Sequence, residues 1–168
     1  IPLDFTTAAE KVMPAVVFIR STQDQSSTGE ETLNVDPFRE FFGPGPRAQR
    51  GPSQSSGSGV IVNESGYIVT NNHVVQDADM VEVTLFDNRT LKAEVIGTDP
   101  DTDLALIKIK ADGLHYLSFV DSDKAKVGEW VLAVGNPYNL NSTVTAGIIS
   151  AKGRNINILR NSSGEGTT

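Results

Sequence analysis

Cysteine is absent from the 168 residues, and histidine occurs only twice. The missing cysteine excludes disulfide bonds, and two isolated histidines cannot hold a structural zinc ion without unusual carboxylate help. No stretch approaches the roughly 20 apolar residues that are needed to cross a bilayer. We therefore expect no metal, no cofactor and no membrane span.

Basic residues are outnumbered, with 14 Lys and Arg against 21 Asp and Glu, which gives a formal net charge of −7. This is the wrong sign for binding a phosphate backbone, so nucleic acid is not an expected partner. Hydrophobic residues make up 38% of the chain and charged residues 21%, as in a folded globular protein. The length suits one domain with an apolar core.

The N-terminal residues predict a short helix followed by a strand. We expect the helix over residues 5–13, because Thr7 and Glu10 have the spacing of a capping box and Pro14 ends it. The strand is expected over residues 15–19.

A long polar loop is predicted next, over residues 21–56, where Ser, Gly, Gln, Glu and Pro dominate. It carries Phe38, Phe41 and Phe42, and three aromatic residues within five positions are unusual for a solvated linker. We expect these rings to dock on another surface.

Short strands with turn signals between them fill the rest of the chain. They are predicted at residues 59–62, 67–70, 81–86, 90–98 and 104–110, and a second group at 130–134, 142–150 and 156–159. Close spacing and alternating apolar residues favour an antiparallel barrel over a parallel sheet. We expect a first β-barrel within residues 1–120 and the start of a second within residues 121–168.

His73 and Asp103 are the strongest candidates for catalytic chemistry. A histidine acts as a general base at neutral pH when a carboxylate holds its ring in one tautomer. Asp103 directly precedes an apolar strand, so we expect it to be drawn into the barrel and to need a hydrogen-bond donor. The ring of His73 is the predicted donor, with Asp101 as the alternative carboxylate.

Calcium is the main rival explanation of this acidic segment, because Asp99, Asp101 and Asp103 have the spacing of a calcium loop. That loop needs a glycine at its sixth position and a glutamate at its twelfth. The sequence has Leu104 and Lys110 there, which argues against calcium.

Four motifs in order resemble the HtrA/Deg family of serine proteases. They are Gly-Ser-Gly-Val-Ile-Val at 57–62, Gly-Tyr-Ile-Val-Thr-Asn-Asn-His-Val-Val at 66–75, Thr-Asp-Leu-Ala-Leu-Ile-Lys at 102–108, and Val-Gly at 127–128 with Ala-Val-Gly-Asn-Pro at 133–137. The resemblance extends through Thr-Val-Thr-Ala-Gly-Ile-Ile-Ser at 143–150 and so covers most of the chain.

The resemblance implies an all-β, chymotrypsin-like double β-barrel, with the first barrel complete, the second truncated and a short N-terminal helix. It implies that His73 is the general base and Asp103 its orienting carboxylate. It further implies a periplasmic or cell-envelope endopeptidase that degrades misfolded or unfolded polypeptides and forms a trimer-based homo-oligomer. Phe5 and the Phe38, Phe41 and Phe42 cluster resemble elements of subunit contacts and of a regulatory loop.

A nucleophilic serine is not evident, because no Gly-Asn-Ser-Gly-Gly segment occurs in the sequence. Ser163, beside Ser162, lies too few residues past Asp103 for this fold, and Ser58 precedes His73. His115 reads as a loop residue. Two hypotheses stay open: part of an active endopeptidase, which we expect to be inactive as these 168 residues alone, or a naturally complete, catalytically inactive binding module on the protease scaffold.

Overall fold

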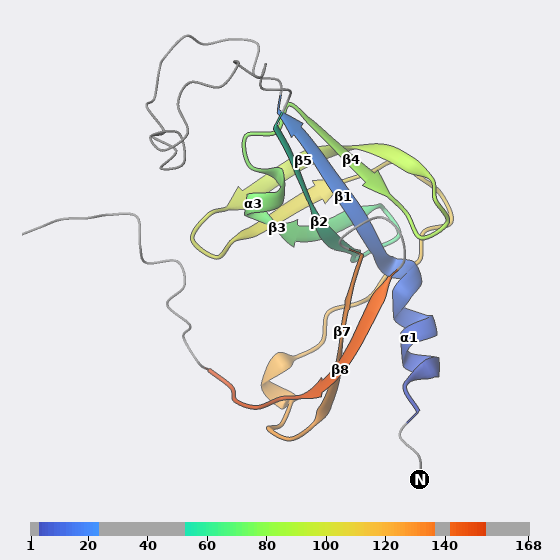
Figure 1. Cartoon of the computed structure of the whole chain (residues 1–168), viewed down its shortest axis with the longest axis vertical. Coiled ribbons are helices and arrows are strands. Elements are labelled where there is room, and N and C mark those ends of the chain that lie inside the picture. Colours follow the sequence, from blue (N-terminus) through green and yellow to red (C-terminus); the bar gives the residue numbers. More distant parts are fainter. Residues whose placement is uncertain (1–3, 24–52, 137–141, 154–168) are drawn as a thin grey trace, which may run out of the picture.

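The computed structural model describes residues 4–23, 53–136 and 142–153, and it is built mostly from β-strands (Figure 1). In chain order the elements are α1 (Thr6–Val12), a 3₁₀ turn (Met13–Ala15), β1 (Val16–Gln23), β2 (Ser53–Ile61), β3 (Tyr67–Asn71), α3 (Asn72–Val75), β4 (Met80–Thr84), β5 (Thr90–Asp99), β6 (Leu104–Lys108), a second 3₁₀ turn (Ser122–Lys124), β7 (Trp130–Gly135) and β8 (Thr143–Ile148). Among these described elements, no helix has the length and apolar character needed to traverse a bilayer.

Strands β1 to β6 form a closed barrel in the order β1-β2-β3-β6-β5-β4, and every neighbouring pair is antiparallel. This confirms the predicted six-stranded β-barrel. Successive strands run in opposite directions, so the barrel has two distinct ends. The residues that follow β3 and those that precede β6 lie at one end. The β4–β5 turn and the residues that follow β6 lie at the other end.

The barrel interior is filled by branched aliphatic side chains that alternate along the strands. Its most deeply buried members, each at most 1% exposed, are Val17, Ile19, Ile61, Ile68, Val83, Ile107 and Ile109. Fully burying one such side chain contributes about 1.5–3 kcal/mol. The core therefore holds the strand ends in fixed positions.

Helix α1 differs in detail from the prediction. Phe5 occupies the N-cap position, and Asp4 Oδ1 accepts a hydrogen bond from Thr6 N at 2.9 Å. The capping box expected from Thr7 and Glu10 is therefore wrong, because Thr7 lies inside α1 and not at its N-cap. Pro14 lies inside the 3₁₀ turn, where its missing N–H is tolerated, and α1 itself ends at Val12.

Strands β1 and β2 extend further than expected, into the predicted loop. Their ladder continues through Ser21 opposite Ser55 to Gln23 opposite Ser53. This polar run lacks the hydrophobic alternation that announces a strand, but pairing satisfies its backbone N–H and C=O groups. Residues 24–52, with Phe38, Phe41 and Phe42, lie outside the described part of the chain.

Strands β7 and β8 form a separate two-stranded antiparallel sheet, with Trp130 opposite Ile148. Figure 1 shows this hairpin beyond the end of the barrel where β1 begins, next to α1. Asn136 N donates to Ser58 Oγ at 2.8 Å and so ties the end of β7 to β2. The second group of strands thus begins as predicted, and the strand expected at 156–159 lies outside the described residues.

Gly57 lies where the barrel has no room for a larger side chain. A Cβ built on Gly57 would lie 2.6 Å from Val74 Cγ2, and Val74 is a buried, β-branched residue of α3. We expect Gly57→Ala to lower the free energy of unfolding by about 1–3 kcal/mol, because the crowded side chains must shift.

The matched control is Gly97→Ala, since a Cβ there would meet nothing within 4 Å. We expect its effect to stay within about 0.5 kcal/mol. Chemical denaturation of both variants measures the difference, and equal costs at the two sites would contradict this packing account.

Candidate active site

His73 lies in α3, the four-residue helix that follows β3 directly. Its neighbours Val74 and Val75 are buried in the barrel core, and Ser21 Oγ donates to the Val74 carbonyl at 2.5 Å. The helix is thus anchored from the side that faces the core. The His73 side chain, by contrast, is 67% exposed.

Asp103 immediately precedes β6 and adopts a left-handed backbone conformation with φ of 55°. Aspartate tolerates this region better than most residues. The preceding turn is stabilised by Asp99, whose carboxylate accepts from Asp101 N at 3.1 Å and from Thr102 Oγ1 at 2.7 Å. In the β3–β6 ladder Asn71 pairs with Leu104, and this register sets Asp103 beside His73.

The two side chains meet as predicted from the sequence. His73 Nδ1 lies 2.7 Å from Asp103 Oδ2, and His73 N donates to Asp103 Oδ1 at 2.9 Å. The predicted contact is therefore confirmed. The expected burial is wrong, because the Asp103 side chain keeps 24% exposure and lies at the end of the barrel rather than inside it.

The hydrogen bonds to Asp103 also set its ionisation. The backbone N–H of His73, followed by the His73 side chain, lowers the pKa of the Asp103 carboxyl below its ordinary value, and the Asn71 side chain contributes in the same direction. Partial desolvation opposes them. The carboxylate is therefore ionised at neutral pH and acts as an acceptor only.

This arrangement suits general-base chemistry. An ionised Asp103 accepts a hydrogen bond from the Nδ1–H group, which places the lone pair of the neutral imidazole on Nε2. With the Nδ1 edge occupied and two-thirds of the side chain exposed, the rest of the ring is accessible to an incoming hydroxyl group. Positive charge that develops on the ring during proton transfer is stabilised by the adjacent carboxylate.

Asn71 and α3 are the parts of the site that sequence reasoning missed. Asn71 Nδ2 lies 3.1 Å from the Asp103 carbonyl oxygen and 3.2 Å from Asp103 Oδ2. The only available signal was the position of Asn71 at the end of a strand, two residues before His73. A four-residue helix leaves no periodicity to detect.

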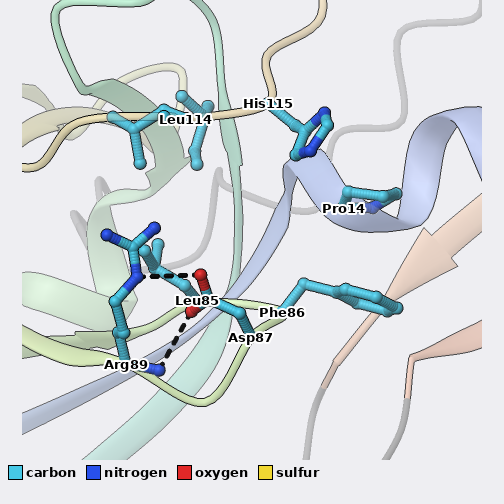
Figure 2. Close-up of a pocket in the computed structure, with 9 residues that line it drawn as sticks. Pro14, Leu85, Phe86, Asp87, Arg89, Leu114 and His115 are labelled. Atoms are coloured by element: carbon cyan, nitrogen blue, oxygen red, sulfur yellow. Dashed lines mark hydrogen bonds and ion pairs between the residues drawn. The ribbon is translucent and has the colours of Figure 1, made fainter.

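His115 lies at the other end of the barrel, in agreement with its interpretation as a loop residue. It lines a pocket of about 220 Å³ together with Pro14, Phe86 and Arg89. Figure 2 shows His115 and Leu114 on one side of this pocket, with the Leu85–Arg89 segment on the other. There Asp87 pairs with Arg89 Nε at 2.8 Å. His73 follows β3 and His115 follows β6, and because these two strands are antiparallel the two histidines lie at opposite ends of the barrel.

The remaining candidates have structural contacts or lie outside the description. Ser58 Oγ accepts a hydrogen bond from Asn136 N and so has a structural contact within the chain. The ring of Phe5 packs against Trp130 within the chain, with centroids 5.6 Å apart, and its subunit contact stays a prediction. Ser162 and Ser163 lie outside the described residues.

The chain belongs to the trypsin-like peptidase domain family, whose profile matches residues 57–167. It is 46% identical over 169 residues to a probable periplasmic serine endoprotease, DegP-like, of Marinomonas sp. (strain MWYL1), with 91% of this chain and 36% of the relative covered. The corresponding protein of Hahella chejuensis (strain KCTC 2396) is 48% identical over 163 residues, with 91% and 34% covered.

Solved structures give the same result. The HtrA-type protease AlgW with decapeptide superposes with a TM-score of 0.71 at 39% identity, covering 94% of this chain and 48% of that one. A serine endoprotease from Yersinia pestis has a TM-score of 0.67 at 34% identity, with 91% and 46% covered. The resemblance to HtrA-type proteases and the chymotrypsin-like fold are thus confirmed. The chain spans about a third of the length of the curated relatives it matches.

The lowered pKa of Asp103 predicts an acid-dependent loss of stability. An aspartate whose folded-state pKa lies below its unfolded value stabilises the fold above about pH 3.9, and this contribution is lost as the pH falls through the folded-state pKa. We expect Asp103→Asn to be less stable than the unaltered chain at neutral pH, and the gap to narrow below about pH 4.

Free energies of unfolding, measured by denaturant at neutral and at acidic pH, test this expectation. Asp101→Asn, an exposed position in the same turn, is the control and should stay within about 0.5 kcal/mol of the unaltered chain. A gap between the unaltered chain and Asp103→Asn that is the same at both pH values would show that Asp103 does not stabilise the fold through its charge.

Proposed function

We propose that this chain supplies the general base, His73, and its orienting carboxylate, Asp103, to an HtrA-type serine endopeptidase. The observation that carries the proposal is the contact of 2.7 Å between His73 Nδ1 and Asp103 Oδ2 at the end of a closed six-stranded barrel. In this role His73 Nε2 takes the proton of a serine hydroxyl and later delivers it to the leaving amine.

The nucleophilic serine and the amides that stabilise the oxyanion are proposed to come from residues that follow this sequence in the whole protein. Support comes from the curated relatives, which are about three times as long as the matched region. It also comes from the chain order, because the two-barrel proteases place histidine, aspartate and serine in that succession.

The substrates are proposed to be unfolded or misfolded polypeptides in the periplasm or cell envelope, cleaved by a trimer-based homo-oligomer. We infer the compartment from relatives that are named periplasmic serine endoproteases. We infer a peptide substrate from the structural neighbour that is named with a decapeptide. Phe5, Phe38, Phe41 and Phe42 are proposed to serve subunit contacts or a regulatory loop.

Activity measurements test the catalytic proposal in a protein that extends this chain through a Gly-Asn-Ser-Gly-Gly segment. We expect His73→Ala to abolish cleavage of a denatured protein and labelling by a fluorophosphonate probe. Asp103→Asn should lower kcat by about 10⁴-fold, because the imidazole is then held in the wrong tautomer. The 168 residues alone should be neither active nor labelled.

The matched control is His115→Ala, which removes the other histidine of the chain at the opposite end of the barrel and should leave activity unchanged. Full activity of His73→Ala would exclude the proposed base. Labelling of the 168 residues at Ser162 or Ser163 would instead indicate a complete, small hydrolase. A stop codon directly after Thr168 in the encoding gene would favour the binding-module hypothesis.

A further inference from the structure

Asn71 occupies the N-cap position of α3 but does not cap the helix. Its backbone is extended, with φ of −86° and ψ of 145°, and its side chain accepts no hydrogen bond from the first turn. An asparagine at this position ordinarily accepts a hydrogen bond from the N–H two or three residues later. The Asn71 side chain therefore does not make the usual capping hydrogen bond, and its amide binds another partner.

Asp103 performs the capping instead, from a different part of the chain. Its Oδ1 accepts from His73 N at 2.9 Å, and its carbonyl oxygen accepts from Asn72 N at 3.0 Å. Two N–H groups at the start of α3 are thus satisfied across the β3–β6 pair. This leaves the Asn71 amide free to bind Asp103 rather than its own helix.

The Asn71 amide faces two oxygen atoms, both of Asp103. Nδ2 lies 3.1 Å from the carbonyl oxygen and 3.2 Å from Oδ2. Only the NH₂ group can be placed there, because the amide oxygen would otherwise meet two acceptors. Oδ2 is also the atom that lies 2.7 Å from His73 Nδ1, so Asn71 and the imidazole share one carboxylate oxygen.

We propose that Asn71 is a positioning residue, whose amide holds the Asp103 carboxylate and its left-handed backbone so that Oδ2 accepts a hydrogen bond from the Nδ1–H group of His73. The terminal torsion of an aspartate is broad, so one donor does not fix the carboxylate plane. His73 N fixes Oδ1, and Asn71 fixes Oδ2 and the carbonyl oxygen of the same residue. The carboxylate then has one orientation toward the ring.

This inference rests on the proposed function for its catalytic meaning, but its first test does not require activity. We would follow the titration of the Asp103 side-chain carboxyl carbon by NMR in the 168-residue chain. Removing a donor from a carboxylate destabilises its ionised form, so Asn71→Ala should raise the Asp103 pKa above that of the unaltered chain. Asn71→Asp keeps the size of the side chain but adds a like charge, and it should raise the apparent pKa further.

The matched control is Asn63→Ala. Asn63 Oδ1 accepts from Tyr67 N at 3.2 Å in the β2–β3 turn, at the other end of the barrel. This control loses a hydrogen bond of similar length, yet the Asp103 titration should be unchanged. If Asn71→Ala fails to fold, Asn71→Leu takes its place, because it keeps a side chain of similar size without a donor or a charge. An Asp103 titration that Asn71→Ala or its replacement leaves unchanged would overturn the proposal, whatever Asn71→Asp does, because a like charge raises the pKa without any hydrogen bond.

A second readout uses the longer, active protein. Asn71→Ala should lower kcat about tenfold or more while KM changes little, because the lost hydrogen bond orients the base and does not contact substrate. Unchanged kcat together with a raised Asp103 pKa would reject a positioning role in catalysis. If Asn71→Ala raises the Asp103 pKa but His73→Ala leaves the longer protein active, the proposed function is rejected and the structural role of Asn71 stands.

Discussion

The site depends on one interaction, the clamp between the β3–α3 junction and Asp103. Three consecutive residues, Asn71 to His73, donate to the side chain or carbonyl group of this aspartate. The clamp closes because β3 and β6 pair with Asn71 opposite Leu104. A shift of one residue in this register would turn the side chains of β6 to the opposite faces of the sheet and move Asp103 away from His73.

The barrel maintains that register from behind the site. Val74 and Val75 bury the inner side of α3, Ser21 binds the Val74 carbonyl, and Gly57 leaves the space that Val74 occupies. The exposed ring of His73 is thus mounted on a helix whose other side is part of the core. A ring with the general-base role proposed for His73 can stay accessible in this way and still be held in one place, as precise proton transfer requires.

The sequence predicted the barrel because its core strands alternate apolar and polar residues, and it predicted the contact of His73 with Asp103 from a carboxylate set against such a strand. It could not show that β1 and β2 continue through Ser21 and Ser55, because these polar residues are held by backbone pairing. Nor could it show the left-handed backbone of Asp103 or the turn of the Asn71 amide, which depend on contacts between segments about 30 residues apart. Local pattern locates strands, whereas side-chain direction at a strand end is set by its tertiary partners.

The protonation of the His73 ring tests the central claim most directly. We predict that ¹⁵N NMR of the neutral ring will show the proton on Nδ1 and the lone pair on Nε2, because Asp103 Oδ2 lies 2.7 Å from Nδ1 and can only accept. In Asp103→Asn this preference should be lost. A neutral ring in the unaltered chain that carries its proton on Nε2 would contradict the account. The lone pair of His73 would then lie on Nδ1, facing Asp103 and not a nucleophile.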